Sequence, residues 1–190
     1  FLIQGIGHGD LIQDTHGDWH ILSLGFRQIH MWQPYHHLGR EVFLTPVTFD
    51  ASGWFSAGTA GTTNYSYEIT GDFVQNPVKK YTFESTEWDK DWCYLRHPVT
   101  SNYELSKHSA VLYGTDITLD ECDTPTFIGI RQRDFDMDCE CDVRCERGEA
   151  GITLYMDEFE HYDIALRKGG SGHEAVLKLN IGNIKHVQSI

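Results

Sequence analysis

Two short motifs carry side chains that could bind a ligand, and glycines mark both. The first motif is GIGHGD at residues 5–10, where His8 lies between glycines and two residues before Asp10. Glycines on both sides allow a positive φ or a close approach to another segment, which would fix the direction of the imidazole. Such a histidine either serves a site or fills a structural role, and the motif alone leaves both open.

The second motif is QPYHHLGRE at residues 33–41, which ends in a glycine, an arginine and a glutamate. We expect Gly39 to bend the chain so that Arg40 projects its guanidinium. The five donors of that planar group suit a carboxylate or vicinal sugar hydroxyls, and a surface arginine without a role is the alternative. His36 and His37 are adjacent and would face opposite ways in an extended chain, so we do not expect them to share a metal ion.

A cysteine-rich segment, CECDVRC at residues 139–145, raises the question of a zinc site. Cys139, Cys141 and Cys145 alternate with charged residues, and structural zinc ligands usually come in turns with CxxC spacing. We therefore predict a strand whose buried face carries these cysteines as small hydrophobic residues. The five cysteines lack the spacing of a secreted disulfide scaffold, which favours a reducing compartment such as the cytoplasm over export.

Short β-rich runs separated by turn residues recur along the chain, whereas no segment keeps helical periodicity for three turns. The expected strands are DLIQD, WHILSLGF, REVFLTPVTF, SAVLYG, TFIGIRQ, DMDCECDVRCE, GITLYMD, HYDIALRK and EAVLKLNIG. This density predicts an all-β fold, and it fits propeller blades, sandwiches or barrels.

The composition changes between residues 59 and 79, where small and polar residues replace the apolar alternation. We predict a linker at 59–79 between a first part, residues 1–58, and a second part, residues 80–190. The first part is too short to form a closed β-domain by itself. Because the sequence begins with Phe1 rather than Met, we expect the natural polypeptide to begin upstream.

Charge and motif content exclude several classes of function. The 190 residues hold 15 Lys and Arg against 28 Asp and Glu, a net charge of −13 that repels nucleic-acid phosphates and anionic membranes. No phosphate-binding glycine loop, serine nucleophile elbow or HExxH helix occurs. Acidic residues are plentiful, but no pair stands out as a catalytic acid and base, so no residue is predicted to be catalytic.

Aromatic side chains are frequent in both parts, and they either fill a core or stack on pyranose rings. The prominent ones are Trp19, Trp32, Tyr35, Trp54, Trp88, Trp92 and Tyr94. We expect most of them in the core.

Several ordered segments resemble glycoside hydrolase family 43, the β-xylosidases and α-L-arabinofuranosidases that carry a C-terminal concanavalin-like β-sandwich. GIGHGDLIQDTHGDWHILSLGFR is similar to the last-blade pattern of that family, and YHHLGREVFLTPVTFDASGWF resembles the stretch that closes its five-bladed propeller. YTFESTEWDKDWCYLRHP, TFIGIRQRDFDMDCECDV and EAGITLYMDEFEHYDIAL are similar to segments of its sandwich.

This resemblance implies the last part of a five-bladed β-propeller followed by an antiparallel β-sandwich that is incomplete at its C-terminus. It implies an inverting glycosidase that removes xylose or arabinose from xylan-derived oligosaccharides. The catalytic carboxylates of the family lie in earlier blades, so we expect this piece alone to be inactive. His8 matches the histidine that helps to organise an axial calcium ion and its water shell, and Arg40 matches the arginine that contacts the sugar.

The sequence departs from the family at residues 130–134. Where members of the family commonly have RRQQH, this sequence has Ile130, Arg131, Gln132, Arg133 and Asp134. Two other functions stay open: a non-catalytic carbohydrate-binding β-sandwich, and a structural β-protein without a ligand. The sequence does not rank xylose against arabinose, and it leaves a homo-oligomer open.

Overall fold

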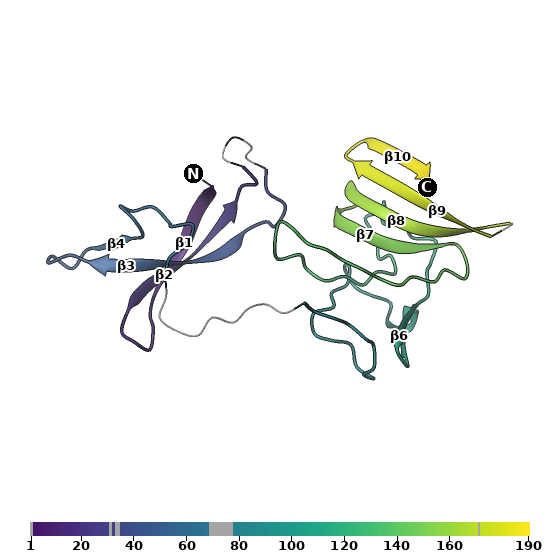
Figure 1. Ribbon diagram of the computed structural model, residues 1–190, viewed down its shortest axis with the longest axis horizontal. Helices are drawn as coiled ribbons and strands as arrows, with labels where there is room; N and C mark the ends of the chain where they lie inside the picture. The colour runs from purple at the N-terminus through teal and green to yellow at the C-terminus, as the bar shows by residue number, and fades with distance from the viewer. Residues whose placement is uncertain (1, 31, 33–34, 69–77, 171) are drawn as a thin grey trace. The chain divides into compact units, whose positions relative to one another are not determined.

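The computed structural model describes residues 2–30, 32, 35–68, 78–170 and 172–190, and these ranges contain strands, turns and loops without an α-helix (Figure 1). The all-β prediction is confirmed. No helix in the described ranges is long and apolar enough to cross a membrane.

The chain forms two compact units. Unit 1 comprises residues 1–77 together with 132–137, and unit 2 comprises residues 78–131 and 138–190. Unit 1 therefore includes a short segment that is distant in sequence from the rest of it.

Unit 1 is built on one antiparallel sheet in the order β1-β2-β3-β4 (Figure 1). Its strands are β1 (Ile3–Gln13), β2 (Trp19–Arg27), β3 (Glu41–Phe49) and β4 (Phe55–Ala57). An aspartate closes each of two hairpins: the Asp50 carboxylate accepts the N–H groups of Ser52 at 2.8 Å and Trp54 at 3.0 Å, and Asp14 does the same between β1 and β2. Such turns explain why short strands follow one another so closely.

Unit 2 contains a second antiparallel sheet and a small hairpin. The sheet has the order β10-β9-β8-β7, formed by β7 (Glu149–Asp157), β8 (Glu160–Gly169), β9 (Gly172–Ile181) and β10 (Ile184–Ser189). A 3₁₀ turn, η1 (Thr100–Asn102), leads into the hairpin of β5 (Tyr103–Ser106) and β6 (Ser109–Leu112).

The two faces of the β7–β10 sheet differ in chemistry. The covered face carries small and polar side chains, among them Val176, His161 and Asp163, of which Val176 is fully buried. The opposite face carries larger apolar side chains, and Leu154 and Ile164 there are more than half exposed. Strict alternation of apolar and polar residues predicted these strands, but it did not indicate which face of the sheet is covered.

Two of the expected strands are wrong. TFIGIRQ contributes only an isolated bridge between Cys93 and Gly129, and DMDCECDVRCE has no ladder partner in the described part of the chain. Cys139 and Cys141 are exposed, so only Cys145 occupies the buried position predicted for all three. Period-two alternation indicates an extended backbone, whereas a strand also needs a hydrogen-bonding neighbour.

The expected linker begins with ordered structure. Thr59 and Thr62 pair in an isolated bridge, and Gly58 beside them has φ +62°. A Cβ at Gly58 would lie 2.1 Å from the Thr62 carbonyl oxygen, so only glycine fits there. Residues 69–77 of this linker lie outside the described residues.

Candidate functional site

His8 lies in β1 at an irregular point of the sheet. The pairing of β1 with β2 shifts register on both sides of Gly7, and His8 itself has φ +56°, as does Gly5 with φ +63°. The glycines that flank His8 are therefore not the residues with positive φ. A Cβ at Gly9 would lie 2.7 Å from Ile21 Cδ1, so this glycine permits close packing on β2 instead. The imidazole is exposed and has no hydrogen-bond partner in the described ranges.

Arg40 ends the bend that precedes β3. Gly39 has φ +74°, a left-handed conformation that glycine adopts without strain, and Arg40 is exposed. The two adjacent histidines contact different neighbours. His36 stacks on Phe26 with ring centroids 4.3 Å apart, and His37 contacts Phe135.

Arg27 and Glu41 form a two-point ion pair across β2 and β3. Arg27 Nε donates to Glu41 Oε2 at 2.8 Å, and Nη2 donates to Oε1 at 2.9 Å. The Arg27 guanidinium carbon also lies 4.7 Å from the ring centre of Phe135. The Glu41 carboxylate raises the pKa of Arg27, and the Tyr65 hydroxyl adds to that effect. A partly buried guanidinium in this geometry is a rigid anchor.

Phe135 also contacts His37. The edge of one ring meets the face of the other, with centroids 5.1 Å apart and an interplanar angle of 63°. Gln132 Nε2 lies 3.2 Å from His37 Nε2 and donates to the Asp134 carbonyl oxygen at 2.7 Å. Sequence reasoning singled out neither Arg27 nor Phe135, and the quoted resemblance to the family segment around Gln132 was the one signal that pointed to this region.

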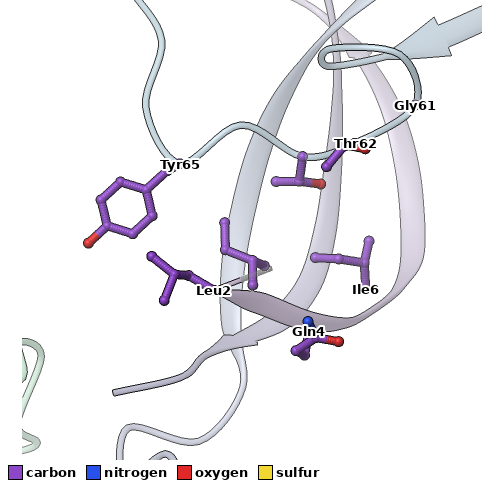
Figure 2. Close-up of a pocket in the computed structure, with 8 residues that line it drawn as sticks. Leu2, Gln4, Ile6, Gly61, Thr62 and Tyr65 are labelled. Atoms are coloured by element: carbon purple, nitrogen blue, oxygen red, sulfur yellow. The ribbon is translucent and has the colours of Figure 1, made fainter. Parts of the chain in front are cut away.

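A pocket of about 440 Å³ opens on unit 1 between the start of β1 and residues 61–65 (Figure 2). It is lined by Leu2, Ile3, Gln4, Ile6, Gly61, Thr62, Thr63 and Tyr65. Figure 2 shows Leu2 and Ile6 on the side opposite the segment that carries Thr62 and Tyr65. The lining contains no carboxylate, imidazole, amine or thiol, and neither His8 nor Arg40 lies in it.

Unit 2 contains a buried polar network around His161. The imidazole lies between two carboxylates, with Nδ1 2.9 Å from Asp163 Oδ1 and Nε2 2.9 Å from Asp120 Oδ1. Asn180 Nδ2 donates to Asp120 Oδ1 at 2.5 Å, and Lys185 Nζ lies 2.9 Å from Asp120 Oδ2. Every ionisable member has a partner, which is typical of a structural network.

The described residues contain no cluster of three or more histidine, cysteine or acidic side chains that could hold a metal ion. Calcium prefers six to eight oxygen ligands, and His8 offers a nitrogen. The described part of this chain therefore does not fit a calcium ion by itself.

The aromatic side chains divide between a ring cluster and exposed positions. Trp88 and Trp92 in unit 2 are half-buried and pack on Phe83, with centroids 6.3 and 5.7 Å away. Trp19, Trp32, Tyr35 and Trp54 are 38%, 82%, 71% and 76% exposed, so the expectation that most of these seven rings lie in the core is wrong.

Residues 80–189 match the family model of the beta xylosidase C-terminal concanavalin A-like domain. The chain belongs to this family. The match covers more than half of the 190 residues. It includes Gln132–Met137, the short segment that belongs to unit 1. It confirms the resemblance to glycoside hydrolase family 43 that the sequence motifs indicated.

Relatives of this family member match over nearly its whole length. "Non-reducing end alpha-L-arabinofuranosidase BoGH43B" of Bacteroides ovatus is 34% identical over 185 residues, which cover 92% of this chain and 34% of the relative. The solved structure "Bacteroides ovatus Xyloglucan PUL GH43B" matches with a TM-score of 0.79 and 29% identity, covering 100% of this chain and 40% of that one. The GH43 BlXynB protein of Bacillus licheniformis shares the fold, with a TM-score of 0.82, 22% identity, and 98% and 38% coverage. The chain thus spans about a third of the curated relative.

Proposed function

We propose that this chain is part of an inverting exo-glycosidase that removes xylose or arabinose units from xylan-derived oligosaccharides. The observation that carries this proposal is the 34% identity to a protein named as a non-reducing end α-L-arabinofuranosidase, which extends over 92% of the chain. A second relative, from Butyrivibrio fibrisolvens, is named xylosidase/arabinosidase and is 24% identical over 179 residues. In this proposal the catalytic carboxylates lie outside the 190 residues.

The proposed domain organisation assigns residues 1–58 to the last part of a five-bladed propeller, 59–79 to a linker and 80–190 to a β-sandwich. The four-stranded antiparallel β1–β4 sheet supports the first assignment, because propeller blades have this layout. The family match over residues 80–189 supports the last.

Arg40 is the proposed sugar-binding residue of this chain. Its guanidinium is exposed and forms no hydrogen bond with another described residue, so its donors are free for a ligand. The neighbouring Glu41 is already engaged by Arg27, so this carboxylate does not pair with Arg40. Arginine suits vicinal hydroxyls because its donors lie in one plane.

His8 is proposed to border the water shell of a calcium ion rather than to ligate it. Its exposed imidazole supports an outer role, and the oxygen ligands would come from outside the described residues. Removing calcium with a chelator should lower the activity of the full-length protein and its melting temperature together. Replacing His8 by Ala should reduce that response, and a chelator without effect on either quantity would contradict the proposal.

The test is an assay of the longest natural polypeptide that contains this chain, with nitrophenyl xylopyranoside and nitrophenyl arabinofuranoside. We expect one of them to be hydrolysed, and Arg40→Ala to lower kcat/KM by about 30- to 150-fold, or about 2–3 kcal/mol. The exposed Arg147→Ala is the matched control and should leave kcat/KM unchanged. Wild-type protein without activity on either substrate would refute the glycosidase proposal.

A carbohydrate-binding module without catalysis is the second candidate, and the exposure of Trp32 and Trp54 favours it. It predicts that the protein is retained on xylan without hydrolysing it. Loss of retention in Trp54→Ala would support this alternative.

A further inference from the structure

We propose that Phe135 is a positioning residue for Arg40, because it fixes the bend that carries this arginine from both sides. The part of this inference that concerns sugar binding by Arg40 rests on the proposed function. The fixed bend itself is a property of unit 1, to which Phe135 belongs. No motif of the sequence assigned this role to Phe135.

The first restraint acts at the residue after Arg40. Glu41 is held by the two hydrogen bonds from Arg27, at 2.8 and 2.9 Å. Phe135 packs against the Arg27 guanidinium, whose central carbon lies 4.7 Å from the ring centre. An aromatic face against a partly desolvated guanidinium stabilises it by cation–π attraction and limits its rotamers. Phe135 thereby keeps Arg27 in the geometry that clamps Glu41.

The second restraint acts three residues before Arg40. The Phe135 ring meets the His37 ring with centroids 5.1 Å apart, and the Gln132 side chain reaches His37 Nε2 at 3.2 Å. Gln132 is itself tied to the backbone of its own segment through the Asp134 carbonyl oxygen at 2.7 Å. The ring and the amide therefore hold His37 from one short segment.

The bend between these two anchors needs such support. Gly39 has φ +74°, and a glycine loses more conformational freedom on folding than other residues do. Arg40 is exposed and has no hydrogen-bond partner among the described residues, so its own side chain does not hold the bend. Besides the stacking of His36 on Phe26, contacts at His37 and Glu41 restrain the direction of Arg40, and Phe135 contributes to those at His37 and Glu41.

Loss of this support should impair catalysis more than folding. A guanidinium that is misplaced by about 1 Å can cost about 100-fold in rate, because transition-state contacts depend on exact position. We expect Phe135→Ala in the full-length protein to lower kcat by about 10- to 100-fold, with KM changed less than threefold. Phe135→Tyr keeps the aromatic face and should retain wild-type kinetics, whereas Phe135→Leu keeps apolar volume without the π face and should be intermediate.

The decisive measurement is a double-mutant cycle with Arg40→Ala. If Phe135 acts through Arg40, then Phe135→Ala should cost less than threefold in kcat/KM once Arg40 is already alanine. Phe159, an exposed phenylalanine in unit 2, provides the matched control, and Phe159→Ala should leave the kinetics unchanged in both backgrounds. Independent, multiplicative effects of Phe135→Ala and Arg40→Ala would overturn the inference.

Backbone hydrogen exchange separates this inference from the proposed function. Phe135→Ala should speed exchange of the amides at residues 37–41 at least tenfold, while Phe159→Ala should not, whether or not the protein hydrolyses a sugar. Unchanged exchange at these amides would overturn the positioning role even in an active enzyme. An inactive wild type with faster exchange in Phe135→Ala would refute the glycosidase proposal and leave the fixed bend supported.

Discussion

His161 Nδ1 lies 2.9 Å from Asp163 Oδ1 on the covered face of β8, and the imidazole is only 3% exposed. The other ring nitrogen lies 2.9 Å from Asp120 Oδ1. The network thus joins β8 to the loop of Asp120 through the imidazole of His161.

Removal of His161 should destabilise unit 2 strongly. His161→Ala leaves the Asp163 carboxylate buried without its partner, and breaking a buried pair in this way costs about 3–5 kcal/mol. Urea unfolding followed by tryptophan fluorescence measures the change. His186→Ala, an exposed histidine of β10, is the control and should stay within about 0.5 kcal/mol of wild type. Equal midpoints for the two variants would show that the network contributes little.

Asp120 should make the stability of unit 2 depend on acid pH. Burial raises the pKa of Asp120, but the hydrogen bonds from Lys185 and His161 outweigh burial and hold it below the usual value of 3.8. A carboxyl whose pKa is lower in the folded state than in the unfolded state stabilises the fold at any pH above its pKa in the unfolded state. This stabilisation is lost as the pH falls through its pKa in the folded state. We expect the unfolding free energy to decrease as the pH falls below about 4.

The Asp120 contribution is isolated by substitution. Asp120→Asn should flatten the pH dependence of the unfolding free energy below about pH 4, because the ionising group is gone. Asp116→Asn, an exposed aspartate of the same loop without a described hydrogen bond, should keep the wild-type slope. Identical slopes for wild type and Asp120→Asn would contradict the assignment.

Gly151 should be essential to the pairing of β7 with β8. A Cβ at this position would lie 2.1 Å from the Ile164 carbonyl oxygen and 2.5 Å from Ala165 Cα, so backbone must shift to admit alanine. Gly151→Ala should destabilise unit 2 by at least about 1–3 kcal/mol, measured as a lower urea midpoint. Gly114→Ala adds a methyl group with nothing within 4 Å and should be neutral within about 0.5 kcal/mol.

The sequence predicted the local features of this protein better than the long-range ones. The alternation in GITLYMD and HYDIALRK was sufficient to place β7 and β8, because period two and turn residues are local signals. The same alternation at residues 137–145 failed, since a strand depends on a neighbour that sequence does not reveal. Glycines drew attention to His8 and Arg40, whereas the contact between Arg27 and Phe135 joins residues more than a hundred positions apart and carries no periodic signal.

Thiol labelling tests the corrected account of the cysteines. Cys139 and Cys141 are exposed, whereas Cys145 is 4% exposed and its thiol donates to the carbonyl oxygens of Arg147 and Gly148 at 3.5 and 3.6 Å. Under native conditions a thiol reagent should modify Cys139 and Cys141, and Cys145 only after unfolding. Peptide mass analysis after a short pulse of reagent identifies the labelled sites.

The rate of thiol labelling at Cys141 should also depend on pH, because it follows the fraction of thiolate. Although the Cys141 side chain is exposed, partial desolvation of its thiol raises the pKa, and the neighbouring Cys139 and Asp142 raise it further. Because the thiolate is the reactive form, Cys141 should react more slowly at pH 8 than a free cysteine peptide and approach its rate only at higher pH. Denaturant removes the burial and should bring the two rates together at pH 8. Rapid labelling of Cys145 under native conditions would contradict its burial and would indicate that all three cysteines at residues 139–145 are exposed.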